Sequence, residues 1–427
     1  MKKINIGLLG LGNIGTGVFE IFQTNGPKIN LSAEKELHIK KILVNNLNKE
    51  RKVSVSSEML TTSIEDLLRD PEIDIIVELL GGIHPAYDYM KEALISKKHV
   101  VTANKAVIAT HGRELIQIAI DNNVALRYEA SVGGGIPIIN TLSKPLSVNR
   151  FQELMGIVNG TTNYILTQMT DFGLEYDEVL KTAQDKGFAE ADPSSDVEGE
   201  DAAYKLSILI STAFGLEVSP DIIPREGITK ISKDDIEYAS QFGYKIKLLA
   251  TAKKTENHLE FHVHPTLIPG THPLASVSNE FNALFLKGNA VDDLMLYGKG
   301  AGPLPTGSAV IGDIVEIAKI IGTNFDPTIS FPENIDRLQL SGEGTSKYYI
   351  HFRVEDKPGA LGIISTAFGN NGISIETVMQ RSRGEKYVPV IYILHNCERE
   401  QLNRTFEEIT KDGTVKEIRS ILRVEEF

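Results

Sequence analysis

Two lysines lie at positions where packing of the fold alone would not require a charged side chain. Lys105 follows an apolar run that ends in Val101-Thr102-Ala103-Asn104. If that run is a strand of a parallel sheet, Ala103 and Lys105 lie at its carboxyl edge, where such sheets bind ligands. Lys205 follows Asp201 by four residues, so the two share one helix face. A positioned ammonium group can protonate an oxygen that gains negative charge, although most Asp–Lys pairs at this spacing are only surface ion pairs.

Two further segments are acidic or glycine-rich. The stretch from Glu190 to Asp201 carries a run of carboxylates that includes Asp196. It is either a solvated loop or a cluster that binds a substrate ammonium group. Glu129 precedes the glycines 133–135, whose exposed backbone carbonyls could join its carboxylate in binding a hard cation such as Na⁺, Ca²⁺ or Mg²⁺. From the residues alone, a simple turn into a helix is the better interpretation of the second segment.

The first residues predict the element that would hold a dinucleotide. Ile4 to Leu9 is a short apolar run, and a helical pattern follows the intervening turn. A glycine turn between strand and helix lets the backbone approach a pyrophosphate, which the helix dipole then stabilises. The expected cofactor-binding residues are Gly10, Leu11, Gly12, Asn13, Ile14 and Gly15.

The same β-α alternation continues to about residue 120. We expect strands at 39–44 and 73–79 and one that begins at 100, with helices at 85–96 and 114–120. Strands that are apolar throughout are typical of a parallel sheet covered on both faces.

The end of the second predicted strand bears on the choice of coenzyme. It carries Asn45-Asn46 and then Lys49 and Arg51, where NAD enzymes commonly place a carboxylate. With no carboxylate to repel a 2′-phosphate and two cations nearby, NADPH is favoured over NADH. A solvated polar loop is an equally good interpretation.

Bulk properties exclude several functional classes. The 427-residue chain carries a formal net charge of −13, which disfavours nucleic acid and anionic membrane surfaces as partners. Its one cysteine, Cys397, cannot form an intrachain disulfide, and no apolar stretch is long enough to span a bilayer. We therefore expect a cytoplasmic protein. His262, His264 and His272 could suggest zinc, but ordinary buried or surface histidines are the better interpretation.

Seven sequence blocks closely resemble the homoserine dehydrogenase family, and six of them go beyond the shared glycine fingerprint. The resemblance covers residues 1–320 and implies interconversion of L-homoserine and L-aspartate 4-semialdehyde. The blocks are GLGNIG (10–15), VELLGG (77–82), VTANKA (101–106), EASVGGGIPII (129–139), GIVNGTTNYIL (156–166), GFAEADPSSDVEGEDAAYKLSIL (187–209) and GKGAGPLPTGSAV (298–310).

The resemblance assigns a role to each candidate residue. Lys205 matches the catalytic general acid and base, Lys105 a second lysine near the nicotinamide, and Asp201 an active-site carboxylate. Glu190, with Asp196 beside it, matches the site of the substrate amino group. A monovalent-cation site, usually for sodium, and the loop closing near the cofactor are also implied. The residues matched to these two features are Glu129, Val132, Gly134 and Ile136 for the cation and Gly302 for the loop.

The last 80 residues resemble the ACT domain, a small-molecule sensor. DKPGALGIISTAFGNNGISIETV carries the resemblance, and the pattern predicts a βαββαβ order. The implied effector is L-threonine, bound between paired modules near Gly359 and residues 371–373. A module that only pairs subunits is the alternative. A homodimer or homotetramer is expected.

The predicted fold class is α/β with a Rossmann-type doubly wound parallel sheet, an α+β catalytic and dimerisation domain, and the ACT domain. The boundaries are 1–128 for the NAD(P)-binding domain, 129–321 for the catalytic domain, 322–346 for a linker and 347–427 for the ACT domain. We expect residues 303–321 to pack back on the first domain. Competing hypotheses are another dehydrogenase on this scaffold, such as an aspartate dehydrogenase, and a catalytically silent amino-acid sensor.

Overall fold

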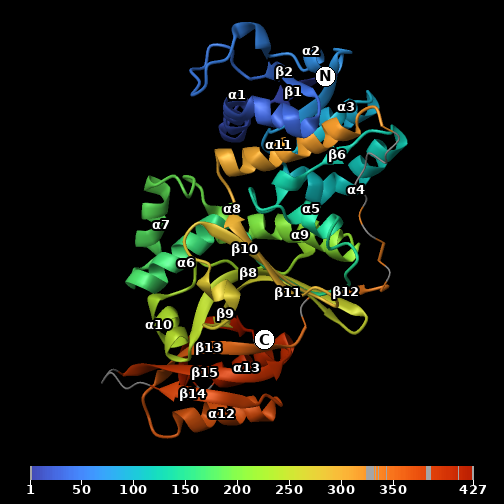
Figure 1. Ribbon diagram of the computed structural model, residues 1–427. Coiled ribbons are helices and arrows are strands. Elements are labelled where there is room, and N and C mark those ends of the chain that lie inside the picture. Colours follow the sequence, from blue (N-terminus) through green and yellow to red (C-terminus); the bar gives the residue numbers. More distant parts are fainter. Residues whose placement is uncertain are drawn as a thin grey trace. The chain divides into compact units, whose positions relative to one another are not determined.

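The chain divides into two compact units. We describe them from a computed structural model (Figure 1), which covers residues 2–323, 331, 333–334, 336–342, 344–380, 386–411 and 413–425. The first unit comprises Met1–Gln152, Tyr204–Ile222 and Asn282–Leu338, and the second comprises Glu153–Ala203, Ile223–Phe281 and Gln339–Phe427. Within the described residues, no helix is both long and apolar enough to cross a bilayer.

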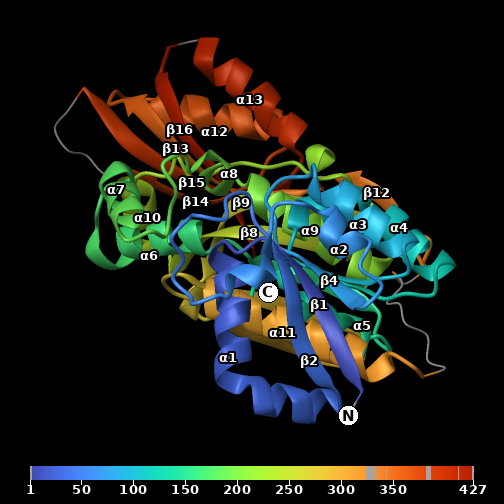
Figure 2. The same cartoon turned by 90° about the horizontal axis from the view of Figure 1, so that it is seen from above.

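The first unit is built on a six-stranded parallel sheet, as predicted. Its strand order, β3-β2-β1-β4-β5-β6, is that of the doubly wound dinucleotide-binding fold. Figure 2 shows β1 and β2 of this sheet running next to each other. The strands are β1 (Lys3–Leu9), β2 (Glu36–Leu43), β3 (Leu60–Thr61), β4 (Ile73–Glu78), β5 (His99–Thr102) and β6 (Leu126–Arg127).

Helices and one strand pair complete the first unit. The helices are α1 (Asn13–Ala33), α2 (Glu65–Leu68), α3 (Ala86–Ile95), α4 (Lys105–Asp121), α5 (Ile138–Ser143) and α11 (Pro303–Ile320); β10 (Phe281–Gly288) pairs with β11 (Asp292–Lys299). Helix α9 (Glu200–Phe214) crosses from the second unit into the first. The helix predicted at 114–120 begins earlier, at Lys105, because the side chain of Asn104 caps it by accepting the amide N–H of Val107.

Helix α11 packs on α1, and their contact is close enough to require glycine. A Cβ atom on Gly17 would lie 2.1 Å from the carbonyl oxygen of Pro303, and one on Gly307 would lie 3.0 Å from the backbone nitrogen of Val18. The two helices lie side by side in Figure 2. Val310, together with other residues of α11, shares one buried apolar core with the strands of the sheet. The chain therefore returns to its first domain after the intervening residues.

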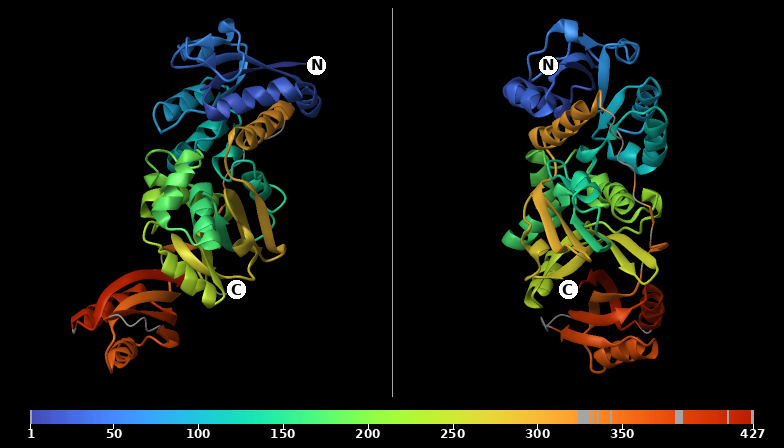
Figure 3. Two further views of the ribbon diagram at one scale, coloured as in Figure 1. Left: turned by 90° about the vertical axis from the view of Figure 1, so that its left-hand side faces the viewer. Right: turned by 45° about the vertical axis from the view of Figure 1, so that its right-hand side comes forward.

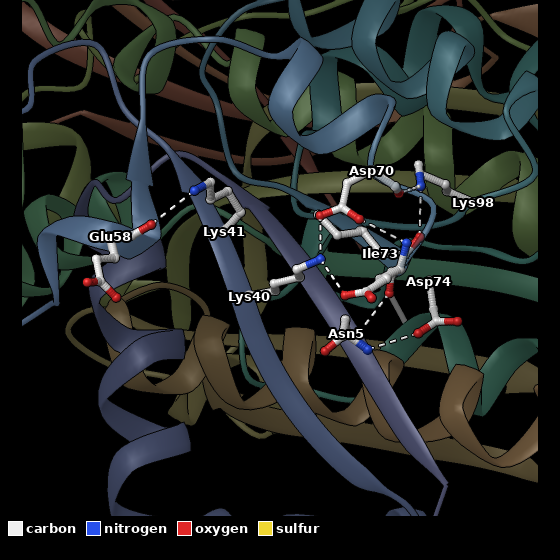
Figure 4. Close-up of polar contacts among 9 residues, drawn as sticks. Asn5, Lys40, Lys41, Glu58, Asp70, Ile73, Asp74 and Lys98 are labelled. Carbon is white, nitrogen blue, oxygen red and sulfur yellow. Dashed lines mark hydrogen bonds and ion pairs between the residues drawn. The ribbon is translucent and has the colours of Figure 1, made fainter.

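A polar cluster fixes the amino end of the sheet (Figure 4). The ammonium group of Lys98 donates to the carbonyl oxygens of Asp70 (2.6 Å), before β4, and of Ile73 (2.8 Å), its first residue. Lys40 of β2 pairs with the Asp70 carboxylate at 2.6 Å, and Asn5 of β1 donates its amide N–H to Asp74 at 2.9 Å. These bonds join β1 and β2 to the start of β4 and to the segment that leads into it.

The second unit contains a mixed sheet. Its strands run in the order β7-β8-β9-β16-β13-β15-β14, and β12 pairs with β9. The elements outside the C-terminal module are β7 (Phe151–Ile157), α6 (Gly160–Phe172), α7 (Tyr176–Asp185), α8 (Ser194–Val197), α10 (Lys233–Gln241), β8 (Tyr244–Thr255), β9 (His258–Pro269) and β12 (Gln339–Gly342). Strand β12 lies in the range expected to be a linker, of which residues 324–330, 332, 335 and 343 fall outside the described part.

The C-terminal module has the predicted βαββαβ order. Both helices share a buried apolar cluster with the strands, and Figure 3 shows them on one face of the sheet. Its elements are β13 (Ser346–Glu355), α12 (Ala360–Asn370), β14 (Ile375–Gln380), β15 (Tyr387–Cys397), α13 (Arg399–Lys411) and β16 (Val415–Val424).

A buried carboxylate joins this module to α10. Asp235 accepts hydrogen bonds from His351 Nδ1 (2.8 Å), Tyr349 (3.1 Å) and Ser420 (2.6 Å) of the module, and from Ser232 (2.6 Å) at the helix start. Burial raises the pKa of Asp235, but the hydrogen bonds and the charge of His351 outweigh it, so the pKa lies below its ordinary value. Four polar side chains thus stabilise the ionised form of Asp235.

The glycine contact between α1 and α11 can be tested by substitution. Gly17→Ala should lower the free energy of unfolding by about 1–3 kcal/mol, because the new methyl group meets backbone that cannot rotate away. Gly26→Ala in the same helix is the matched control, since a Cβ atom there meets nothing within 4 Å. It should raise stability by about 0.5–1 kcal/mol through helix propensity. Chemical denaturation of both variants measures the difference, and equal effects would refute the close contact.

Candidate functional site

The glycine turn after β1 has the geometry that a phosphate group needs. Gly10 adopts φ +98°, and a Cβ atom on Gly15 would lie 2.4 Å from the carbonyl oxygen of Gly10. Neither position accepts a side chain without strain. A Cβ atom on Gly12 would meet nothing within 4 Å, so that glycine borders open space at the start of α1.

A cleft of about 500 Å³ opens beside this turn, at the carboxyl ends of β1, β2 and β4. The loop after β2 forms one wall, and Arg51 holds that loop by donating to the carbonyl oxygens of Asn46 (2.5 Å), Leu47 (3.0 Å) and Lys49 (2.8 Å). Several basic and amide side chains therefore border the cleft. Its lining comprises Gly10–Asn13, Thr16, Leu43–Asn46, Lys49–Lys52 and Leu79–Gly81.

A buried network sets the position of Lys105. Glu78, at the end of β4, accepts hydrogen bonds from Thr102 Oγ1 (2.5 Å) and from the amide N–H of Leu80 (2.6 Å). Thr102 Oγ1 in turn accepts the amide N–H of Asn104 at 2.9 Å. Burial raises the pKa of Glu78 to about 7, and these hydrogen bonds oppose the rise. Lys105 follows at the first position of α4, partly exposed.

Sequence reasoning missed the roles of Glu78 and Asn104. The available signal was a carboxylate ending an otherwise apolar strand, since an unpaired charge is costly to bury.

In the second unit, Asn159 brings two predicted carboxylates together. Its amide nitrogen donates to Asp196 Oδ1 (2.7 Å) and to Asp201 Oδ2 (2.8 Å). Its amide oxygen caps α6 by accepting the N–H of Thr162 at 2.8 Å. Asn159 lies in the block GIVNGTTNYIL, but the sequence alone assigns it no role. One amide therefore fixes both carboxylates relative to the start of α6.

Glu190, the predicted binder of the substrate amino group, has an exposed side chain. Gln184 steadies its loop by donating to the backbone carbonyls of Glu190 (3.1 Å) and Ala191 (3.3 Å). Lys205 is partly exposed on α9, four residues after the buried Asp201. That Lys105, Lys205 and Glu190 meet in one cavity stays a prediction.

The Glu129 turn is buried and held by α11 and α5. The Glu129 carboxylate accepts the amide N–H groups of Ile139 (2.8 Å) and Asn140 (2.7 Å), and the amide N–H of Glu129 donates to Asp313 (2.9 Å). Burial raises the pKa of Glu129, and burial followed by the charge of Glu129 raises that of Asp313 well above its usual range. Two carboxyl groups thus lie close together in a buried place, where ionising both is unfavourable.

Glycines at the tip of this turn abut the loop that ends at Gly302. Gly133 and Gly134 have φ +72° and +53°, and a Cβ atom on Gly134 would lie 2.4 Å from the carbonyl oxygen of Gly300. Gly302 itself adopts φ +113° directly before α11. The Glu129 turn and the Gly302 loop, both predicted as ligand sites, therefore lie side by side within the first unit.

Three family models match consecutive parts of the chain. The model described as "Homoserine dehydrogenase, NAD binding domain" matches residues 10–129. The model described as "Homoserine dehydrogenase" matches residues 137–315, and the model described as "ACT domain" matches residues 348–413. Their order is the one that the sequence blocks predict.

Full-length relatives give the same result. The homoserine dehydrogenase of Synechocystis sp. is 42% identical over 431 residues and the alignment covers 99% of each chain. That of Bacillus subtilis is 39% identical over 437 residues, which are 100% of this chain and 99% of its own. Among solved structures, a homoserine dehydrogenase from Thiobacillus denitrificans has a TM-score of 0.93 at 37% identity and matches 100% of this chain and 99% of its own.

Proposed function

Because the chain belongs to the homoserine dehydrogenases, which are NAD(P)-dependent oxidoreductases, we propose that Lys205 and Lys105 carry its proton transfers. The reaction interconverts L-homoserine and L-aspartate 4-semialdehyde. In the proposal, Lys205 is the general acid and base and Lys105 assists it at the carboxyl edge of the sheet. The Asp201 carboxylate stabilises the charged form of Lys205, and Glu190 binds the substrate ammonium group together with Asp196.

The arrangement of α4 and α9 within the first unit carries this proposal. Both helices line one shallow pocket, and Arg113, near the middle of α4, lies 3.3 Å from Glu217, which follows α9. Lys105 and Lys205 are each one turn before residues of that pocket, on the same helix faces. From this shared pocket we infer that the two side chains belong to one site. The pocket residues are Ile108, Ala109 and Gly112 of α4 and Ile208 and Ser211 of α9.

The chemistry follows from charge. A bound nicotinamide supplies the hydride in one direction and accepts it in the other. Reduction of the aldehyde leaves negative charge on its oxygen, which the ammonium of Lys205 stabilises and protonates. In the reverse direction, neutral Lys205 takes the hydroxyl proton. Asn159, by holding Asp196 and Asp201, keeps anionic oxygens in place for the substrate ammonium group and for Lys205.

We propose NADP(H) as the preferred coenzyme. The cleft beside the glycine turn is bordered by Asn45, Lys49, Arg51 and Lys52, which suit a 2′-phosphate. Glu50 lies in the same loop and adds one negative charge.

We propose a monovalent cation, sodium, at the Glu129 turn. The proximity of the buried Glu129 and Asp313 carboxylates fits a neighbouring positive charge, and the turn's left-handed glycines let its backbone bend around one. Glu129, with the carbonyl oxygens of Val132, Gly134 and Ile136, would hold it. The cation would neutralise charge and rigidify the loop before α11.

We further propose L-threonine as the effector of the ACT domain and a homodimer or homotetramer as the assembly. Support comes from the loop at Gly359, which adopts φ +88° before α12, and from Asn371, held by Glu408 at 3.1 Å. Homoserine oxidation, measured with and without threonine, tests the effector. Unchanged rates would mean that the module only pairs subunits.

We also propose that the protein acts in the cytoplasm. Its single cysteine, Cys397, is buried, and a chain with one cysteine has no intrachain disulfide, as is usual for cytoplasmic proteins.

Substitution of Lys205 tests its proposed role in proton transfer. The purified enzyme should reduce NADP⁺ when given L-homoserine, and Lys205→Ala should lower kcat by at least about a hundredfold. The dissociation constant for NADP⁺ should stay within twofold, because Lys205 acts on the substrate. Lys181→Ala, at an exposed lysine of α7, is the control and should keep wild-type activity. Retention of most activity by Lys205→Ala would contradict the assignment.

Substitutions in the loop after β2 test the choice of coenzyme. Asn45→Asp places a carboxylate at the cleft and should lower kcat/KM for NADP⁺ relative to NAD⁺ about tenfold, by repelling the 2′-phosphate. Asn48→Asp makes the same charge change in the same loop outside the cleft lining and should shift the ratio less than threefold. If both variants leave the ratio unchanged, the loop does not read the 2′-phosphate.

Thermal unfolding in different salts tests the proposed cation site. Without coenzyme, NaCl should raise the unfolding temperature of the wild type by a few degrees over equal choline chloride, since a bound ion stabilises the folded state. Glu129→Gln should abolish that difference. Equal unfolding temperatures of the wild type in both salts would rule out a sodium site at this turn.

A further inference from the structure

A polar cavity of about 200 Å³ lies in the second unit, where β9 meets the ACT domain. Strands β9 and β16 pair over only two positions, Arg423 with Thr266 and Val424 with Leu267. The cavity opens beside this short junction. It is lined by Thr251, Lys253 and Thr255 of β8, Glu260 and His262 of β9, Thr345–Lys347, Asn396 and Arg423–Glu425.

Two buried polar atoms at the cavity lack a hydrogen-bond partner. They are Nε2 of His262 and Oγ1 of Thr251, whose residues are 6% and 2% exposed and are paired across β8 and β9. Buried polar groups are almost always bonded to protein or to a bound molecule. Burial lowers the pKa of His262 well below its ordinary value, so its ring is neutral. Both residues line the cavity, so two buried polar groups without a partner among the described residues stand in its wall.

A fixed cation stands at the cavity. Arg423 Nε donates to His264 Nδ1 at 2.7 Å, and its guanidinium group lies over the ring of Tyr348, 5.7 Å from the centroid. Ser346 accepts a further bond from the same group. Because His264 Nδ1 accepts from an arginine, it is not available to a metal ion. A guanidinium held in this way is pre-organised for a carboxylate.

Negative charge stands at the same cavity. Burial raises the pKa of Glu425 to about 7, Glu153 and Glu260 add to the rise, and Lys253 and Arg423 oppose it. Lys253 also faces Glu153, at 3.4 Å. Glu425 is therefore a partly buried carboxylate for which a further positive charge would be favourable.

The mixture of charges selects the ligand. A simple anion would be repelled by Glu260 and Glu425, and a simple cation by Arg423, Lys253 and Lys347. A molecule with both charges satisfies both groups. The volume is several times the roughly 30 Å³ of one water molecule in the liquid, which suits a ligand of a few heavy atoms.

We propose that this cavity binds a small zwitterionic amino acid, with its carboxylate at Arg423 and its ammonium group at Glu425, beside Thr251 and His262. The site lies within one chain, at the β9–β16 junction, and is distinct from the Gly359 loop, where ACT effectors are expected. Occupation would strengthen the junction between β9 and the ACT domain. The proposal does not depend on the assignment of Lys205 or on threonine inhibition.

Calorimetric titration of the full-length protein tests the proposal. L-Alanine and L-threonine are the probes, and propionate and propylamine each keep only one of the two charges. At least one amino acid should bind, and both single-charge analogues should bind at least about tenfold more weakly. Absence of binding by both amino acids, or equal binding of an analogue, would overturn the proposal.

Variants locate the binding event. Glu425→Gln should weaken amino-acid binding about tenfold or more while keeping the fold, because it removes a charge that burial already disfavours. Thr251→Val, which removes only the unpartnered hydroxyl, should weaken it several-fold. Glu417→Gln, at an exposed position of β16, should change it less than twofold. Wild-type affinity in both cavity variants would place the ligand elsewhere and refute the site.

Discussion

The contact between α11 and α1 is the constraint on which the first unit depends. A glycine on each helix lets their backbones approach closely, so residues 303–320 return to the sheet that begins the chain. Asp313 of α11 then holds the buried Glu129 turn, and the loop before α11 abuts Gly134. Helix α11 thereby holds three features of the first unit. They are the start of α1 with its glycine turn, the proposed cation turn at Glu129 and the loop that ends at Gly302. Loss of that contact would disturb all three together.

The polar groups of the site are positioned by buried hydrogen bonds rather than by surface ion pairs. Glu78 and Asn104 set the start of α4 ahead of Lys105, and Asn159 joins Asp196 to Asp201. Such networks are strong in a buried setting because an unpaired member there is costly. Positioning of this kind suits hydride transfer, in which a proton donor must already stand at the oxygen that becomes negative.

The sequence predicted what is encoded locally. The glycine turn at 10–15, the parallel sheet and the βαββαβ module follow from spacing and periodicity, and the comparisons confirm the family. The start of α4 was placed nine residues late because a side-chain cap, not apolar periodicity, begins that helix. The bonds of Asn159 join positions 37 and 42 residues apart, which no periodic pattern encodes. The cavity at Arg423 likewise needs strands distant in the chain to meet.

Convergence of Lys105 and Lys205 on one reacting oxygen is the central claim. A crystal structure of the protein with NADP⁺ and L-homoserine tests it most directly. We expect the substrate hydroxyl oxygen within about 3 Å of the Lys205 ammonium nitrogen and within reach of Lys105 directly or through one water, with Glu190 at the substrate amino group. A complex in which the lysine side chains open onto different surfaces, with the hydroxyl contacting neither, would contradict the account.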